Sequence, residues 1–205
     1  MNDGFRIPAG SGESELTEKR SRFLAHLRTV ETEDEAKAFI QAMKREFHDA
    51  RHNCWCYRIH PSVDRFSDDG EPSGSAGMPM LEVFRREEVF NLVCVVTRYF
   101  GGVLLGTGGL SRAYSGAAKQ ALTEAGTVFL GRRQQLSLQC PYALSERIRS
   151  LISSAGAEIT GFDYGEAVCM TVLAPDAEML AQQIRELSGG RVSPSIGETV
   201  YGGLG

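Results

Sequence analysis

The glycine-rich segment 101–109 has a spacing suited to binding phosphate. An apolar run, residues 92–96, precedes it and a helical pattern follows it, so it joins a strand to a helix. Backbone N–H groups at such a junction can bind anions. Arg98 and Arg112 flank the segment, and Tyr99 or Tyr114 can stack on a base. The predicted anion or RNA site includes the glycines of this segment: Gly101, Gly102, Gly106, Gly108 and Gly109.

The same segment departs from the named nucleotide-binding motifs. Thr107 stands where a Walker A loop needs lysine, and Ser111 stands where a dinucleotide fingerprint needs its third glycine. A nucleophile elbow is absent as well. We therefore predict no cofactor. The alternative to an anion site is a tight connection in which the glycines permit backbone contact and positive φ.

A second polar group combines His52 with the loop 68–77. The loop contains side chains that can bind or transfer protons, namely Asp68, Asp69, Glu71 and Ser73. The alternative to the anion or RNA site is a hydrolase-type site, in which His52 acts together with the carboxylates of residues 68–71. Helix capping and Asx turns account for such a loop equally well. No triad, HExxH or deaminase pattern is present, so no residue is assigned as catalytic.

Metal binding is not predicted at either group. The acidic loop lacks the EF-hand spacing. His52, Cys54 and Cys56 share one face of a strand, but positions four apart on a strand are about 13 Å apart, too far for one ion. A half-buried strand carrying a satisfied histidine is the simpler interpretation.

These groups need a mixed α/β framework to position them. Apolar alternation predicts strands at 21–30 and 53–60, and the continuous apolar run 92–96 predicts a strand at 89–99 that is buried on both sides. Apolar residues at helical spacing predict helices at 33–48 and about 110–125. A short helix is expected at 81–86. Thr32 and Glu35 form a capping box that begins the first helix. Residues 1–20 are polar and are interpreted as a loose arm, which leaves 21–133 as the first domain.

The pattern starts afresh after residue 133 and predicts a second domain over 136–205. Strands are expected at 136–140, 158–164, 167–173 and 191–201, and helices at 145–155 and 176–187. The order β-α-β-β-α-β is that of the ferredoxin-like split βαβ unit. The expected class is α+β, with a domain boundary near 132–136.

Composition and charge limit the classes of function. The chain has 205 residues, 42% of them apolar, and a net charge of −4. Residues 136–205 hold four basic and eight acidic groups, so they carry the whole net charge and residues 1–135 are neutral. This balance excludes a nonspecific nucleic-acid coat but not a local site, and no DNA partner is predicted. The acidic second domain allows a third hypothesis, a protein–protein adaptor that docks a basic partner.

The N-terminal residues lack the features of a secretory signal, and no apolar run reaches membrane-spanning length. The five cysteines are an odd, sparse set, which is unlike a disulfide framework. We expect reduced thiols, a cytoplasmic location and no membrane partner.

Three segments together resemble the YigZ/Impact family. They are Arg-His-Asn-Cys-Trp-Cys-Tyr at 51–57, Ser-Asp-Asp-Gly-Glu-Pro-Ser-Gly-Ser-Ala-Gly-Met-Pro at 67–79, and Val-Val-Thr-Arg-Tyr-Phe-Gly-Gly-Val-Leu-Leu-Gly-Thr-Gly-Gly-Leu at 95–110 followed by Arg-Ala-Tyr at 112–114. The similarity extends over about residues 17–125. Cys56 and Leu104 depart from it, because the family usually has alanine and lysine there.

The resemblance implies a first domain like the second domain of ribosomal protein S5, an α/β sandwich, and a ferredoxin-like second domain similar to one of elongation factor G. It implies no established catalytic activity. Eukaryotic members act in translational control, so we expect a non-enzymatic protein with an RNA, ribosomal or translational protein partner. The missing lysine leaves Arg98 and Arg112 as the cations of the glycine segment.

Overall fold

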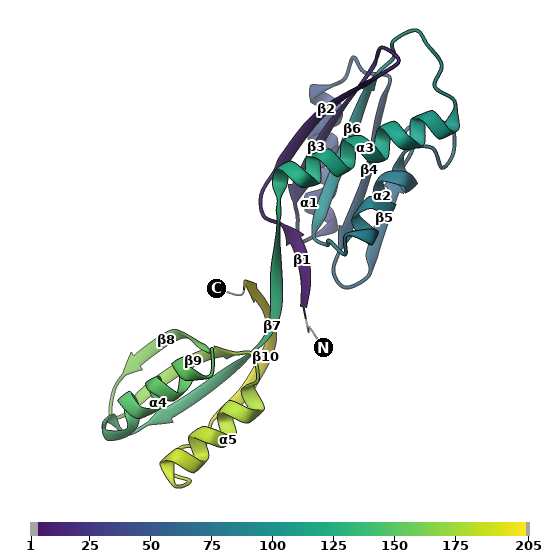
Figure 1. Ribbon diagram of the computed structural model, residues 1–205. Helices are drawn as coiled ribbons and strands as arrows, with labels where there is room; N and C mark the ends of the chain where they lie inside the picture. Colours follow the sequence, from purple (N-terminus) through teal and green to yellow (C-terminus); the bar gives the residue numbers. More distant parts are fainter. Residues whose placement is uncertain (1–3, 204–205) are drawn as a thin grey trace. The chain divides into compact units, whose positions relative to one another are not determined.

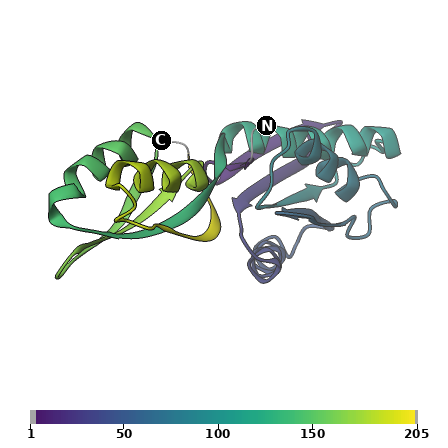
Figure 2. The same ribbon diagram turned by 90° about the horizontal axis from the view of Figure 1, so that it is seen from below.

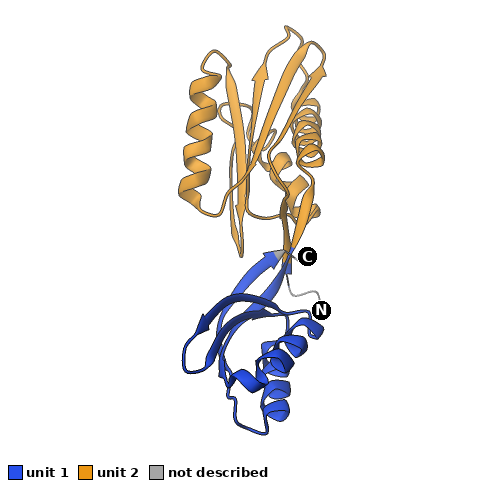
Figure 3. Cartoon of the chain, turned by 90° about the vertical axis from the view of Figure 1, so that its left-hand side faces the viewer, with its two compact units in different colours: residues 1–4, 130–205 blue, residues 5–129 orange. Residues whose placement is uncertain are grey.

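The structure is a computed structural model that describes residues 4–203. The chain forms two compact units, residues 5–129 and residues 1–4 with 130–205, coloured separately in Figure 3. We call them the N-terminal unit and the C-terminal unit. None of the helices in the described residues is both long and apolar enough to cross a membrane.

A five-stranded antiparallel sheet forms the frame of the N-terminal unit. Its strand order is β2-β3-β6-β4-β5 (Figure 1). The strands are β2 (Gly12–Glu18), β3 (Ser21–Thr29), β4 (His52–Ile59), β5 (Val63–Ser67) and β6 (Leu92–Tyr99). The central strand β6 is buried along nearly its whole length, as its continuous apolar run predicts.

Helices cover both faces of this sheet (Figures 1 and 2). One face carries α2 (Gly77–Arg86) and α3 (Thr107–Ala125), and the other carries α1 (Glu33–Glu46). The Thr32 hydroxyl accepts the Glu35 N–H at 3.2 Å and so caps α1, as predicted. The α/β sandwich expected for this unit is therefore present.

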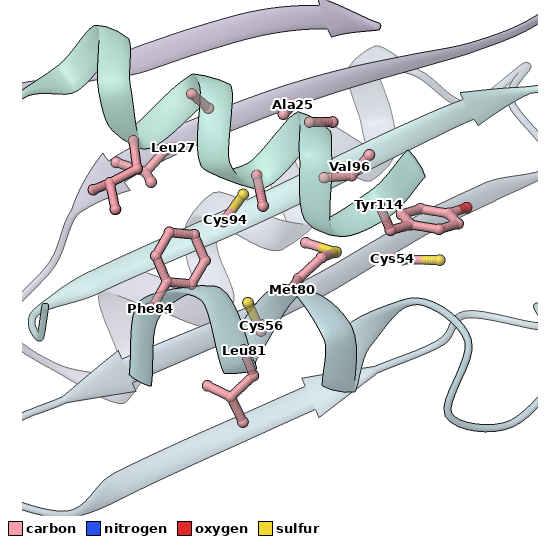
Figure 4. Close-up of a cluster of buried hydrophobic side chains, with 14 of the residues drawn as sticks. Ala25, Leu27, Cys54, Cys56, Met80, Leu81, Phe84, Cys94, Val96 and Tyr114 are labelled. Atoms are coloured by element: carbon pink, nitrogen blue, oxygen red, sulfur yellow. The ribbon is translucent and has the colours of Figure 1, made fainter. Parts of the chain in front are cut away.

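The larger core of the unit lies between the sheet and α2 and α3 (Figure 4). The buried side of α3 is rich in alanine, which lets the helix approach the strands closely. Three thiols, those of Cys54, Cys56 and Cys94, lie in this core, and burial raises the pKa of each. All five cysteines are free.

The interpretation of residues 1–20 as a loose arm is wrong for the described part of that segment. β1 (Gly4–Pro8) and β2 are strands, and β2 pairs with β3 along its whole length. β2 is an edge strand with several exposed polar side chains, so apolar alternation does not mark it. Residues 1–3 lie outside the described residues.

The C-terminal unit has the predicted order β-α-β-β-α-β. Its elements are β7 (Thr127–Cys140), α4 (Tyr142–Ser154), β8 (Glu158–Tyr164), β9 (Val168–Ala174), α5 (Ala177–Ser188) and β10 (Ser195–Gly203). The strands lie in the order β10-β7-β9-β8, each pair antiparallel, and β1 adjoins β7. This order is that of the split βαβ unit, so the predicted α+β class is confirmed.

The boundary predicted near 132–136 falls inside β7. The division between the two units lies between residues 129 and 130, and β7 continues through it without a loop. In the sequence, Gly131, Arg132 and Arg133 directly precede the point where the pattern starts afresh. In the structure all three are strand residues paired with β10.

Candidate functional site

A buried ion pair joins two of the sequence motifs. The Arg98 guanidinium donates to the Glu71 carboxylate at 2.7 Å, and the Tyr114 hydroxyl donates to the same carboxylate oxygen at 2.8 Å. The side chains of Arg98 and Glu71 are 8% and 3% exposed. Burial is the main reason that the pKa of Tyr114 is raised, with Cys54 and Glu71 adding to the effect. Tyr114 therefore stays protonated and can donate.

The central sheet positions Arg98. It lies on β6 between Phe23 of β3 and His52 of β4, which are its register partners. Its guanidinium lies 5.6 Å from the centre of the Phe23 ring, and the Ser21 hydroxyl accepts a long hydrogen bond from it. Its Nε is buried and has no partner within the described residues.

The acidic loop is tied to the fold by its own carboxylates. Asp68 accepts from the backbone N–H groups of Gly74, Ala76 and Gly77, at 2.7, 3.0 and 2.8 Å. The last two contacts put a negative charge at the N-terminus of α2, where the helix dipole favours it. Asp69 accepts from the Asn53 N–H at 2.8 Å and pairs with Lys44 at 2.5 Å. These contacts make Asp68 and Asp69 structural groups.

The acidic loop also orients His52. The His52 Nδ1 lies 2.9 Å from the carbonyl oxygen of Asp69. A carbonyl only accepts, so Nδ1 carries the proton and Nε2 remains as the second hydrogen-bonding atom. The contact is to backbone, and within the described residues no carboxylate forms the hydrogen bond to His52 that the hydrolase hypothesis requires.

A small pocket opens beside His52. It has a volume of about 220 Å³ and is lined by Arg51, His52, Arg98, Phe100 and Leu104. Phe100 is 49% exposed, and the Arg98 guanidinium lies 5.5 Å from the centre of its ring. The pocket thus combines basic groups with an exposed aromatic face. We call it the His52 pocket.

The predicted glycine nest is divided between a loop and a helix. Gly101 donates its N–H to the Ser21 hydroxyl at 3.2 Å, and Gly102 and Gly106 have positive φ angles of 82° and 73°. Gly108 and Gly109 already belong to the first turn of α3. A Cβ on Gly101 would lie 2.0 Å from the carbonyl carbon of Arg20, so glycine is required there by close approach.

Two predicted roles change with these contacts. Tyr114 is fully buried and bound to Glu71, so it cannot stack on a base. Arg112 is exposed at the start of α3 and lines a different groove from Arg98. Tyr99 remains half-buried, with its hydroxyl donating to Asp49 at 2.8 Å; its pKa is raised by burial and by this contact. Ser73 is exposed in the acidic loop.

Several residues beside the pocket were not selected from the sequence. Arg51 and Phe100 line it directly. Lys19 and Arg20 form the exposed tip of the β2–β3 hairpin, and the Arg20 backbone abuts Gly101. The sequence could have identified Arg51 and Phe100, because both lie inside the motifs that carry the family resemblance. In the described residues, no group of three or more His, Cys, Asp or Glu side chains is arranged to hold a metal ion.

Comparisons with known proteins agree with this arrangement of motifs. The model of the Impact N-terminal domain matches residues 19–122, and that of a domain of unknown function (DUF1949) matches residues 138–191. The chain is 35% identical to the IMPACT family member YvyE of Bacillus subtilis, covering 93% of this chain and 90% of that one. It is 38% identical to YigZ of Escherichia coli over 78% of this chain and 81% of that one.

A solved structure is also similar over almost the full length. It is described as a crystal structure of a hypothetical protein, is 33% identical, and matches with a TM-score of 0.65 over 97% of this chain and 99% of that one. The motifs at 51–57, 67–79 and 95–114 all lie within the residues matched by the Impact N-terminal model. The chain belongs to the IMPACT family.

Proposed function

We propose that this chain is a cytoplasmic, non-enzymatic RNA- or ribosome-binding protein that acts in translation. The observation that carries the proposal is the His52 pocket, where Arg51, His52 and the exposed ring of Phe100 meet. Single-stranded RNA is bound by this combination, because cations hold the phosphates and aromatic rings stack on bases.

The surroundings of the pocket support the same ligand. The Lys19–Arg20 tip adds two exposed cations beside Gly101, and no acidic side chain within the described residues forms an ion pair with Arg51, Lys19 or Arg20. Arg98 has its charge balanced by Glu71, so its role is to shape the pocket and orient Phe100. Leu104, 83% exposed, stands at the rim where the family commonly has lysine, which places more of the phosphate binding on Arg51.

The hydrolase hypothesis receives less support from the contacts. Asp68 is bound by three backbone N–H groups, Asp69 by Lys44 and Asn53, and Glu71 by Arg98 and Tyr114. Each carboxylate is thus already engaged in holding the fold. The adaptor hypothesis rests on the net negative charge of the C-terminal unit. It predicts protein partners whose binding is weakened by salt and is lost on deletion of residues 136–205.

The test is binding of the full chain to a labelled single-stranded RNA of about 20 nucleotides, measured by fluorescence anisotropy at several salt concentrations. Arg51→Ala is expected to weaken binding about tenfold and to reduce the slope of log K against log salt by about 0.7, the value for one lost phosphate contact. Phe100→Ala is expected to weaken binding without changing the slope. Sedimentation with ribosomes tests the same variants against the ribosomal ligand.

The matched control is Arg45→Ala, which removes an exposed cation of α1 that does not line the pocket. Equal binding of RNA and ribosomes by the wild type, Arg51→Ala and Phe100→Ala would overturn the proposal. An equal loss in Arg45→Ala would do so too, because it would mean that binding follows net charge and not the pocket.

A further inference from the structure

A second hollow of the N-terminal unit lies between α2 and α3. Its volume is about 530 Å³, more than twice that of the His52 pocket. The α2 side presents Met78, Pro79 and Val83, and the α3 side presents Ser111, Ser115 and Gly116. We call it the α2/α3 groove. Its floor is apolar, and its α3 wall is low because the residues there are small.

The groove is formed by the faces of α2 and α3 that are not buried against the sheet. Residues 77, 80, 81 and 84 of α2 and residues 110, 113, 114, 117 and 118 of α3 are buried against the sheet. The lining residues alternate with them along each helix, so they point to the outer side of the same layer. The groove is therefore built into the packing of the helices on the sheet.

The charges at the rim are positive. Arg86 and Arg112 are exposed, and no carboxylate in the described residues forms an ion pair with either. Lys119 pairs with Glu87, outside the groove lining. The single acid of the lining, Glu82, is balanced by Arg85 at 2.7 Å. The groove thus has an apolar floor and, within the described residues, one unpaired guanidinium group on each wall, that of Arg86 on α2 and that of Arg112 on α3.

The length of the groove suits a short helical contact. Its α3 wall runs from Ser111 to Lys119, nine residues whose Cα atoms span about 12 Å of helix axis. That distance is about two turns, the length over which an amphipathic helix places anchors at i, i+4 and i+7. Small residues on the α3 wall allow the backbone of an incoming helix to approach closely.

We propose that the α2/α3 groove docks an acidic amphipathic helix of a partner protein. Apolar side chains of that helix pack on Met78, Pro79 and Val83. Its carboxylates, on either side of the apolar stripe, pair with Arg86 and Arg112, whose planar guanidinium groups suit bidentate carboxylate binding. The contact is separate from the His52 pocket and does not depend on the function proposed for it.

The floor of the groove favours a peptide over RNA. RNA gives stacking surfaces and phosphates, and its binding sites pair cations with exposed aromatic rings. None of the described residues that line this groove is aromatic. An apolar floor of methionine, proline and valine is instead complementary to leucine or phenylalanine side chains.

The experiment uses the full chain and three synthetic peptides of about 18 residues, a length that gives five helical turns. The first has leucine at i, i+4, i+7 and i+11 on a background of glutamate and alanine. The second has the same composition with the leucines dispersed around the helix. The third has lysine in place of glutamate. Fluorescence anisotropy of a labelled peptide measures each affinity.

The first peptide is expected to bind at least tenfold more tightly than the other two. Arg86→Glu, Arg112→Glu and Val83→Asp are each expected to weaken that binding at least tenfold, whereas Arg45→Glu on α1 and Arg51→Glu in the His52 pocket leave it unchanged. Circular dichroism of each variant confirms that it is folded. Variants of exposed residues on both walls keep the test independent of any one variant's folding.

Equal affinity for the striped and dispersed peptides would overturn the proposal, and so would binding that is insensitive to both arginine reversals. Single-stranded RNA could also compete with the labelled peptide. If Arg112→Glu removes this competition and Arg51→Glu does not, the groove is a nucleic-acid surface and the proposal is overturned. Loss of RNA binding in Arg51→Glu with unchanged peptide binding would separate the two sites.

Discussion

The interiors of the two units differ in chemistry. The N-terminal unit buries Glu71, Arg98, Asn53 and Thr97 beneath its helices, and these groups are linked in hydrogen-bonded pairs. The C-terminal unit has an apolar core in which Leu, Ile, Val, Met and Ala side chains predominate. A buried ion pair contributes little net stability compared with apolar packing of the same volume. Among the described residues the C-terminal unit also buries an arginine, Arg133, but without an ion pair, so a buried ion pair distinguishes the N-terminal unit.

The exposed groups differ in the same way. The basic residues of the His52 pocket and of the α2/α3 groove belong to the N-terminal unit, and the net negative charge belongs to residues 136–205. The C-terminal unit folds as expected from its amphipathic pattern alone. The comparison can be tested by removing equivalent features from each unit.

The largest expected effect comes from separating the buried ion pair. Arg98→Met leaves the Glu71 carboxylate buried without its cation, so we expect a loss of about 3–5 kcal/mol in the free energy of unfolding of the N-terminal unit. Trp55, the single tryptophan, lies in β4 and reports on this unit during denaturation.

The double variant Arg98→Met, Glu71→Met is expected to recover much of that loss, because no charge is then left buried. The matched control in the other unit is Arg149→Met, which breaks an exposed pair with Glu146 and should change stability by less than about 1 kcal/mol. A double variant as unstable as Arg98→Met would contradict this account of the pair.

A smaller difference is expected between two aspartates that cap helices. Asp68 accepts three backbone N–H groups before and at the start of α2, and Asp176 accepts one, from Met179, at the start of α5. We expect Asp68→Ala to cost about 2–3 kcal/mol and Asp176→Ala about 1 kcal/mol. Hydrogen exchange of the two helices measures both; similar costs would mean that the acidic loop is held by other contacts.

The smallest expected effect is the contribution of His60 to the loss of stability at low pH. Burial lowers the pKa of His60 below its usual 6.5. The unfolded chain then takes up the proton first, so this contribution to stability is present above about pH 6.5 and is lost as the pH falls through the lowered pKa. His60→Phe keeps a ring against Phe5, 3.9 Å away, and removes the titration.

Denaturation followed by Trp55 fluorescence at pH 7.5 and pH 5 measures the difference. The wild type should lose more stability on acidification than His60→Phe does. Parallel losses in the two proteins would mean that His60 does not contribute to the acid sensitivity of the N-terminal unit.

Most of the fold could be predicted from local patterns. Alternation marked β3 and β4, and helical spacing marked α1, α3, α4 and α5, because each buries one clear apolar face. A continuous apolar run marked β6, which is buried on both faces. Two edge strands of the N-terminal unit, β2 and β5, were missed. β2 and β5 carry polar side chains on much of their surface, so their pairing depends on neighbours that are distant in sequence.

The site could be predicted only as a set of segments. The sequence indicated His52, the acidic loop, Arg98 and Tyr114, and the structure brings them together. The pairing of Arg98 with Glu71 could not be foreseen, since it depends on the register of β3, β4 and β6 and on how Asp68 folds the loop. Arg112 looked equivalent to Arg98 because both flank the glycines, but one is on a strand that faces the core and the other is on an exposed helix turn.

Each unit contains buried cysteines whose reaction with a thiol reagent reports how fast that unit opens. Cys54, Cys56 and Cys94 are sealed in the N-terminal core, visible in Figure 4, and Cys140 is sealed in the C-terminal core, whereas Cys169 is half-exposed. A thiol-reactive dye should therefore label Cys169 first, and the other four only when their unit opens. In Cys169→Ser, the mass added over time would then record the opening rates of the two units in a single sample.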